Sequence, residues 1–315
     1  MCNHARMVID VTYHSDPGCP WAYSASPALA VLRWRYGDQL RWRLVVIGLT
    51  EHAEQYLRRG YTPAGSARGY RAFRRYGMPF ATQPRPRIAA TGRACRAIVA
   101  TRLLAPGREF AAFRALQFAW FTTPLVLDED EAIAEVLGGV EGVDVEAILA
   151  ALDDPEVEAA YQADRAEART AAGSPTAFQG KAADTDGAVR YTAPSVIFEQ
   201  SGRRLEAGGF QPVEAYDVLV ANLDPTLERS PPPDNPLPAL ERFSEGLVTQ
   251  EVAAIMTRGN DRPDPAAAED ALIALVADGE ATRTPLGNDA LWTVATPAPR
   301  DELAARRAAA RAPAG

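Results

Sequence analysis

Residues 15–23, Ser-Asp-Pro-Gly-Cys-Pro-Trp-Ala-Tyr, constrain the fold more than any other stretch of this chain. They follow an apolar run at residues 7–13, whose β-forming side chains predict a strand, and precede an apolar-periodic segment at residues 28–36, which predicts a helix. The Asp-Pro-Gly turn signal places Cys19 at or beside the helix start, and Pro20 suits the first helical turn. Free backbone N–H groups and the helix dipole lower a thiol's pKa there, so the pattern predicts a reactive cysteine.

The same segment resembles the active-site element of the DsbA-type branch of the thioredoxin superfamily, whose pattern is Cys-Pro-Trp-Cys. The resemblance is strongest to actinobacterial, mycothiol-dependent DsbA-like oxidoreductases, and extends to kappa-class glutathione transferases and 2-hydroxychromene-2-carboxylate isomerases. Residues 191–198, Tyr-Thr-Ala-Pro-Ser-Val-Ile-Phe, resemble the strand that carries the family's cis-proline. Residues 205–211 and 212–223 resemble its last hairpin strand and C-terminal helix, so the likeness covers residues 7–224.

The resemblance implies an α/β, thioredoxin-like fold with a large helical insertion between the second and third strands, at residues 50–190. It implies that Cys19 and Pro194 carry the catalysis, with Pro194 in the cis form opposite the cysteine, and that the exposed backbone of Ala193 pairs with a thiol ligand. A proline that simply begins a strand is the alternative for Pro194. No tightly bound cofactor is expected, and mycothiol or glutathione would serve as co-substrate.

Ala22 departs from the family pattern, because it stands in the place of the second cysteine. A dithiol enzyme attacks with one thiolate and resolves the mixed disulfide with the other. Since Ala22 has no thiol, this resolution is impossible within the motif. The sequence therefore argues against a general dithiol oxidase, and it leaves open a monothiol enzyme or a degenerate member whose cysteine has lost its role.

Other candidate site residues each have a structural alternative. Pro20, Trp21 and Tyr23 would line the thiol site, although either aromatic side chain could equally belong to the core. His14 ends the first strand and would help to form the thiolate, or would be a structural histidine. Cys95 would resolve the mixed disulfide if a helical roof closed over it, or would be a small core residue.

The composition is that of an ordinary globular protein with ample core, since 47% of the 315 residues are hydrophobic and 23% are charged. No stretch approaches the ~20 apolar residues of a membrane span, and the N-terminus lacks the apolar core of a secretion signal. The three cysteines are too few and too scattered for a disulfide framework, which fits a reducing cytoplasm. No histidine has the spacing of a metal site. We expect a cytoplasmic protein without membrane contact or metal.

Hydrophobic periodicity predicts the remaining elements of the first domain. Residues 40–49 become continuously apolar and indicate a second, buried strand parallel to the first. Residues 173–188 are rich in Gly, Ser, Thr and Asp and indicate a loop. The insertion is otherwise mainly helical, with helices expected at residues 93–104, 110–121, 130–136, 145–152 and 155–169.

Charge is unevenly spread over the insertion. Residues 55–108 contain twelve arginines and no Asp or Glu, whereas residues 128–167 contain fourteen carboxylates and one arginine. The basic segment is either an electropositive wall for an anionic substrate or thiol cofactor, or a set of helices that pair with the acidic ones or face water. Its interleaved aromatic residues also permit nucleic-acid binding, which the net charge of −8 disfavours.

The C-terminal part forms a second unit. We expect a DsbA-like domain at residues 1–224, a proline-rich, stiff linker at 225–238, a second domain at 239–298 and an Ala/Arg-rich tail at 299–315. In the second domain, three helices and a hairpin around Gly287-Asn-Asp resemble a winged-helix domain. Its helices are expected at residues 238–243, 249–257 and 265–278, and its strands at 280–286 and 290–295.

The third of these helices argues against DNA binding. Residues 264–279 carry four acidic residues and no Lys or Arg, whereas a phosphate-facing helix needs the opposite sign. A packing or dimerisation module is therefore favoured, and a homodimer is one candidate assembly.

The sequence as a whole predicts a thiol–disulfide oxidoreductase or thiol-dependent reductase that acts through Cys19 alone, with a low-molecular-weight thiol and a small substrate, for which an anion is one candidate. Two alternatives stay open. One is a kappa-class-like thiol S-transferase or isomerase, in which a serine stands at the reactive position and the bound thiol is activated without covalent attachment. The other is a redox-responsive regulator that uses the winged-helix unit.

Overall fold

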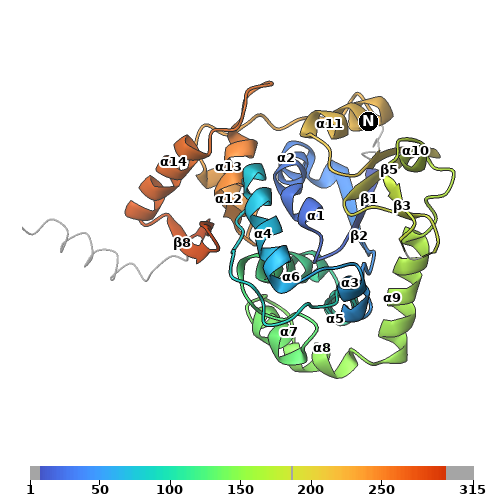
Figure 1. The fold of residues 1–315 in the computed structure, drawn as a ribbon. Coiled ribbons are helices and arrows are strands. Elements are labelled where there is room, and N and C mark those ends of the chain that lie inside the picture. Colours follow the sequence, from blue (N-terminus) through green and yellow to red (C-terminus); the bar gives the residue numbers. More distant parts are fainter. Residues whose placement is uncertain (1–7, 186, 296–315) are drawn as a thin grey trace, which may run out of the picture.

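The computed structural model describes residues 8–185 and 187–295, and a four-stranded mixed sheet in the order β2-β1-β5-β6 lies at its centre (Figure 1). β1 (Ile9–Ser15) runs parallel to β2 (Leu40–Val46) and antiparallel to β5 (Ser195–Gln200), which pairs antiparallel with β6 (Arg203–Gly208). The parallel pairing of the first two strands and the thioredoxin-like α/β fold are as predicted.

Two helices connect β1 and β2, where the sequence indicated one. α1 (Pro20–Ser24) begins directly after Cys19, and α2 (Ser26–Tyr36) follows. Pro27 explains the break, because it has no N–H with which to continue the hydrogen-bond ladder from α1, whereas a proline is tolerated in the first turn of a new helix. The 3₁₀ turn η1 (Gly37–Gln39) leads from α2 into β2.

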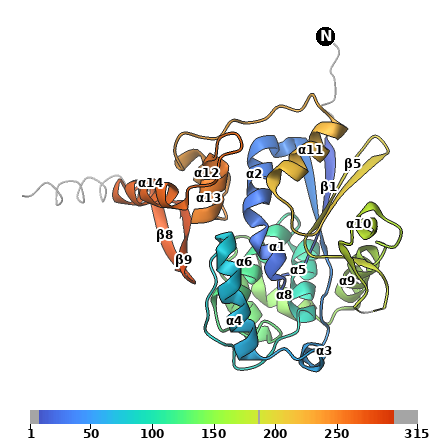
Figure 2. The ribbon, with the colours of Figure 1, turned by 45° about the horizontal axis from the view of Figure 1, so that its top comes forward.

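The insertion between β2 and β5 is mainly helical, and α5 to α8 gather at one end of the molecule (Figures 1 and 2). The five expected helices are confirmed, with ends that differ from the predicted ones by at most one residue. They are α5 (Gly92–Leu104), α6 (Glu109–Thr122), α7 (Asp130–Leu137), α8 (Val145–Ala151) and α9 (Pro155–Ala168).

Two further helices, α3 (Ala53–Arg58) and α4 (Pro63–Phe73), were not delimited from the sequence. α3 has no fully buried residue, and α4 has only Ala67. The Thr62 side chain caps α4 by accepting a hydrogen bond from Gly65 N (O···N 3.0 Å). The 3₁₀ turn η2 (Arg74–Tyr76) extends α4.

The predicted loop at residues 173–188 is only partly irregular. It contains the short helix α10 (Pro175–Phe178), which the Ser174 side chain caps, and β3 (Ala182–Ala183), which pairs with β4 (Arg190–Tyr191). The loop prediction is wrong for these residues, because elements of two to four residues are too short to leave a periodic signal.

The proline-rich linker is attached to the first domain instead of crossing free space. After α11 (Val213–Leu223), the Ser230 N–H donates to Arg35 O (2.8 Å), and Trp34 Nε1 donates to Pro231 O (2.8 Å). Gln39 also holds the linker, through Oε1 to the Glu228 N–H and Nε2 to the Glu228 carbonyl. The linker therefore follows the last turn of α2.

The C-terminal module, residues 237–294, contains three helices and a three-stranded sheet in the order β7-β9-β8. The predicted helices and hairpin are present, but the two-residue strand β7 was missed; residues 296–315, with the tail, lie outside the described residues. The elements are α12 (Leu237–Arg242), β7 (Leu247–Val248), α13 (Thr249–Met256), α14 (Pro265–Ala277), β8 (Ala281–Leu286) and β9 (Asp289–Val294).

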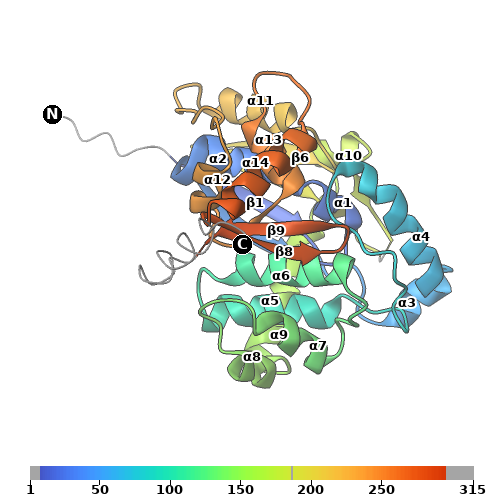
Figure 3. The same ribbon diagram turned by 90° about the vertical axis from the view of Figure 1, so that its left-hand side faces the viewer.

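A buried ion pair joins this module to the first domain. Glu251 of α13 is fully buried and accepts two hydrogen bonds from Arg114 of α6 (2.8 and 2.6 Å), one from Val248 N (2.9 Å) and one from the Ser26 hydroxyl. A buried carboxylate is tolerated only when it is paired in this way. α13 packs along α2, and the β8–β9 hairpin lies against α6 (Figure 3).

Candidate active site

Cys19 lies where the chain leaves the sheet, between β1 and α1. Its backbone N–H donates to Asp16 O (3.2 Å) and closes the turn that precedes α1. Its thiol donates to the carbonyl oxygen of Ala193 (Sγ···O 3.0 Å), which is 174 residues away in the sequence. The Ala193–Pro194 peptide bond is cis, as the sequence predicts. The fold thus brings the two sequence motifs into direct contact.

The surroundings of this thiol oppose its ionisation. The pKa of Cys19 is raised to about 12, mainly because burial disfavours the thiolate. The Asp16 carboxylate acts in the same direction, while the N–H groups of Ala22 and Trp21 and the Arg190 guanidinium act in the opposite direction. The predicted lowering of the pKa is therefore wrong in this conformation, because α1 has only five residues and the cysteine is only 7% exposed. The thiol is protonated at neutral pH.

Asp16 is a buried carboxylate beside the cysteine, and its sequence context indicates only a turn. It accepts hydrogen bonds from Gly18 N (2.9 Å), Leu49 N (2.8 Å), the Thr91 hydroxyl (3.0 Å) and the Cys95 thiol (3.6 Å). Burial raises its pKa and these donors lower it. Asp16 fixes the active-site turn to the loop after β2 and to the start of α5.

A cavity of about 680 Å³ lies beside Cys19, within the ~300–1,000 Å³ typical of small-molecule sites. The predicted thiol-site residues Pro20, Trp21 and Ala193 line it. Trp21 is 41% exposed, and its ring packs edge-on against Phe73 (centroids 4.9 Å apart). Residues 56–89, which we call the strap, supply most of the remaining wall.

Two other predicted site residues lie away from this cavity. The Tyr23 ring is buried and stacked on Phe121 (4.7 Å), so it occupies the core position that was its alternative. His14 is buried and stacked on Tyr191 (4.7 Å), and burial lowers its pKa to about 4. Its imidazole is therefore neutral at pH 7. The thiol of Cys19 donates its hydrogen bond to Ala193 and not to His14, so His14 does not have the predicted role of forming the thiolate in this conformation.

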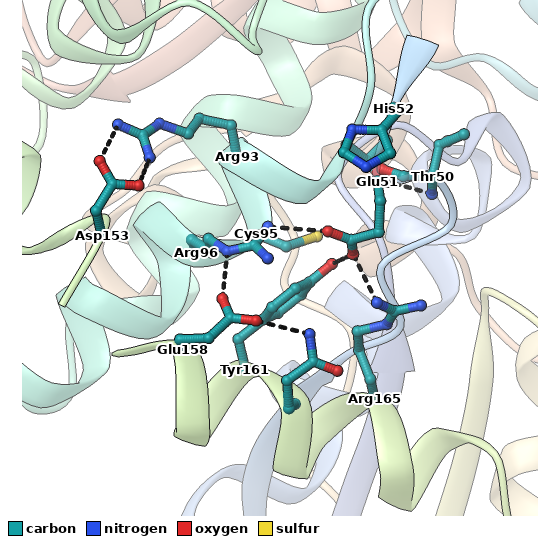
Figure 4. Close-up of polar contacts among 12 residues, drawn as sticks. Thr50, Glu51, His52, Arg93, Cys95, Arg96, Asp153, Glu158, Tyr161 and Arg165 are labelled. Atoms are coloured by element: carbon teal, nitrogen blue, oxygen red, sulfur yellow. Dashed lines mark hydrogen bonds and ion pairs between the residues drawn. The ribbon is translucent and has the colours of Figure 1, made fainter. Parts of the chain in front are cut away.

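Cys95 faces a polar network inside the protein, which we call the core-side network (Figure 4). Within it, the Glu51 carboxylate accepts hydrogen bonds from the Tyr161 hydroxyl, from Arg165 (2.8 Å) and from Arg96 (3.1 Å). Burial raises the pKa of the Cys95 thiol well above its ordinary value, with the nearby carboxylates acting in the same direction. Cys95 is completely buried, and its thiol donates a hydrogen bond to Asp16.

Four residues of the arginine-rich segment are paired with carboxylates. Arg87, Arg93, Arg96 and Arg102 form ion pairs with carboxylates of the acidic helices or the turn before them, as one of the sequence-based alternatives predicted. Arg87 also lines the cavity.

Arg59 and Arg85 line the cavity and have no carboxylate partner among the residues that the structure describes. Arg85 donates to Leu125 O (2.8 Å) and to the Tyr70 hydroxyl (3.2 Å), and its Nη2 is buried without a hydrogen-bond partner in the described ranges. Arg190 also lines the cavity and bonds to Thr185 Oγ1 (3.2 Å). Arg190 carries no motif of its own, so only the fold reveals it.

Within residues 8–185 and 187–295, no group of three His, Cys, Asp or Glu side chains is arranged to hold a metal ion. In the same ranges, none of the helices has the length and apolarity that crossing a bilayer requires.

The fold and the cysteine at the start of α1 define a thioredoxin-like protein of the thiol–disulfide oxidoreductase type. Residues 10–193 match the model of the DSBA-like thioredoxin domain, and the chain belongs to this family. A search of curated proteins finds no match. The matched range ends at Ala193, so the C-terminal module lies outside it.

Solved structures support the same fold. A protein from Nitrosomonas europaea assigned as a protein disulfide isomerase superposes with a TM-score of 0.51 and 19% identity, over 68% of this chain and 97% of its own. A probable DsbA oxidoreductase from Streptomyces coelicolor gives a TM-score of 0.51 and 19% identity, over 69% of this chain and 91% of its own. About a third of this chain therefore has no counterpart in these structures.

Proposed function

We propose that the protein is a thiol–disulfide oxidoreductase that acts through Cys19 alone, together with a low-molecular-weight thiol such as mycothiol or glutathione. The Cys19 sulfur attacks a disulfide RS–SR′, so that a Cys19–SR bond forms and the S–S bond of the substrate breaks. The leaving sulfur takes up the proton that Cys19 loses, and R′SH is released. The thiolate of the low-molecular-weight thiol R″SH then attacks the Cys19–SR bond, releasing RS–SR″ and returning Cys19 to its thiol form.

The observation that carries this proposal is the position of Cys19, at the wall of the cavity and in contact with Ala193 next to cis-Pro194. Ala22, in the next turn, is buried and has no thiol. Cys95 would have to leave Asp16 before it could resolve a mixed disulfide, so an external thiol is the simpler partner. Use of such a thiol fits a cytoplasmic location.

The arginines of the cavity support a small anionic substrate or an anionic group on the thiol. Arg85 lines the cavity, and none of the described residues supplies a carboxylate to neutralise its guanidinium. Its charge stands over the Trp120 ring (5.0 Å), which holds it in place without cancelling it. Arg59 lies on the same wall. A carboxylate or sulfonate on the ligand would be the complement of these groups.

Mass spectrometry of the intact protein after treatment with oxidised mycothiol or glutathione tests the proposal. We expect one thiol adduct on the wild type and on Cys95→Ala, none on Cys19→Ala, and release of the adduct by the reduced thiol. An internal Cys19–Cys95 disulfide would mean that Cys95, and not an external thiol, resolves the mixed disulfide. Absence of any adduct would contradict nucleophilic attack by Cys19.

The high pKa of Cys19 favours a second candidate, the kappa-class-like S-transferase or isomerase. A protonated Cys19 could donate its S–H hydrogen bond to the thiolate of a bound co-substrate, much as the serine of that class does. Cys19→Ser separates the two mechanisms, because a serine retains the donor but cannot form the disulfide. Activity that survives in Cys19→Ser and disappears in Cys19→Ala would favour the transferase.

The C-terminal module gives less support to a redox-responsive regulator. α14 contains no basic residue, and the Asn288 side chain at the hairpin tip bonds to the first domain. The exposed apolar side chains Ile273 (51%) and Val276 (37%) on α14 leave a homodimer as a hypothesis, which sedimentation would test.

A further inference from the structure

The strap, residues 56–89, contains α4 and η2 followed by a long irregular stretch, and it closes the cavity over Cys19. The residues that line the cavity come from both halves of the strap, with Tyr70 and Phe73 before its middle and Gln83 and Arg85 after it. Whatever fixes the middle of the strap, residues 77–81, therefore sets the shape of the substrate space.

Five hydrogen bonds hold residues 79–81 in the middle of the strap. Tyr23 of α1 donates its hydroxyl to Pro79 O (3.0 Å), Arg74 donates both Nε and Nη2 to Phe80 O (3.0 and 2.6 Å), and the Ala81 N–H donates to Phe121 O (2.8 Å). The fifth bond runs from the Phe80 N–H to the side-chain oxygen of Asn288 (2.7 Å). Only this last partner comes from the C-terminal module.

The hairpin tip that carries Asn288 fits closely against the strap. Gly287 precedes it with φ of +59°, and a Cβ at that position would lie 3.1 Å from the Thr122 methyl and 3.4 Å from Ala81 N. At the other end of the segment, Gly77 (φ +85°) packs against the side chain of Gln250 from α13. The C-terminal module thus grips both ends of residues 77–81.

Phe80 connects this grip to the cavity. Its ring is completely buried and contacts those of Tyr23 (5.1 Å), Phe121 (5.2 Å), Tyr70 (5.8 Å) and Phe73 (6.0 Å). Three of these four, Tyr70, Phe73 and Phe121, line the cavity, and Tyr23 belongs to the helix that follows Cys19. A shift of the Phe80 backbone would therefore move the cavity wall.

We propose that Asn288 is a positioning residue for the substrate cavity: by accepting the Phe80 N–H, the hairpin of the C-terminal module fixes the strap in its closed position. The effect on substrate binding rests on the proposed function, whereas the hydrogen bond between Phe80 and Asn288 does not depend on it. About two thirds of this chain superposes on nearly the whole length of the solved structures described above. The module is therefore a device by which this chain shapes a site that related folds build without it.

A pair of substitutions at this position tests the proposal in the full chain. Asn288→Ala removes the acceptor, whereas Asn288→Asp keeps an oxygen in the same place, and Thr284→Ala, on an exposed position of the same hairpin, is the control. With the activity above, we expect Asn288→Ala to raise KM about 5- to 10-fold with kcat changed less than about twofold, because the bond is worth roughly 1 kcal/mol. Asn288→Asp should restore KM to the wild-type value.

Two readouts do not depend on turnover. Amide hydrogen exchange in residues 77–90 should be faster in Asn288→Ala, and a bulky maleimide should label Cys19 faster, with Asn288→Asp and Thr284→Ala like the wild type. If the wild type lacks activity, the proposed function fails while these readouts still decide the role of Asn288. Unchanged exchange and labelling in Asn288→Ala would overturn the inference, as would an equal loss of kcat in both Asn288 variants.

Discussion

A cysteine and an arginine lie on each side of the Asp16 carboxylate, one pair toward the cavity and the other toward the protein core, but the two pairs have different partners. On the cavity side, Cys19 contacts a backbone carbonyl, and Arg85 lines the cavity without a carboxylate partner in the part of the chain that the structure describes. On the core side, Cys95 bonds to Asp16 itself, and Arg96 pairs with both Glu51 and Glu158 (Figure 4). A guanidinium whose charge is already neutralised contributes to stability, whereas one that is held in place without neutralisation is available to a ligand.

The largest expected difference between the two sides concerns the thiols. Cys19→Ala should lower turnover of the disulfide substrate by at least ~10³-fold, as loss of a nucleophile does, whereas Cys95→Ala should stay within about twofold. Steady-state kinetics of both variants, with unfolding curves to confirm that each is folded, measure this. Equal losses in the two variants would mean that the thiols act together.

The arginines should separate in the same way. Arg85→Gln should raise KM for an anionic substrate about tenfold, equivalent to about 1.4 kcal/mol, and should weaken its salt dependence. Arg71→Gln is a matched control, since Arg71 is an exposed arginine of the strap that lies outside the cavity wall. An unchanged KM in Arg85→Gln would return this side chain to a structural role.

Glu51→Gln should have the opposite signature. It removes the charge shared by Tyr161, Arg96 and Arg165, so we expect the free energy of unfolding to fall by about 2–3 kcal/mol. KM should not change, because Glu51 does not line the cavity. Urea unfolding and kinetics on the same preparation test both halves of this expectation.

The smallest expected effect is a loss of stability in alkali that both thiols share. Burial raises the pKa of each thiol above its unfolded value of 9.0, so above pH 9 the thiol stays protonated in the folded state but ionises in the unfolded state. Their contribution is therefore complete below pH 9 and is lost as the pH rises, by about 1 kcal/mol per thiol between pH 9 and 10. Unfolding curves of Cys19→Ala and Cys95→Ala across this interval should each be flatter than those of the wild type.

Local sequence signals predicted much of the fold. Apolar periodicity located α5 to α9 within one residue at each end, and Asp264 with Pro265 marked the start of α14. α3 and α4 were not delimited from the sequence, and Ala67 is the one buried residue among them. β7, at Leu247–Val248, is defined only by its pairing with β9.

The site was predictable where a motif carried it. The turn and helix signals located Cys19, and the likeness of residues 191–198 located Pro194, which the fold places next to it. The pKa of Cys19 was not predictable, because it depends on burial by residues distant in the sequence. Arg190 and Asn288 also gain their roles only from contacts across the fold.

The Arg114–Glu251 pair has a consequence for how this chain can be divided. Separating the module from the first domain would break this pair and expose to water the faces of α2 and α13 that pack together. We therefore expect the two parts to melt together in a single transition. The proline-rich linker therefore marks a boundary in composition but does not separate two units that unfold independently.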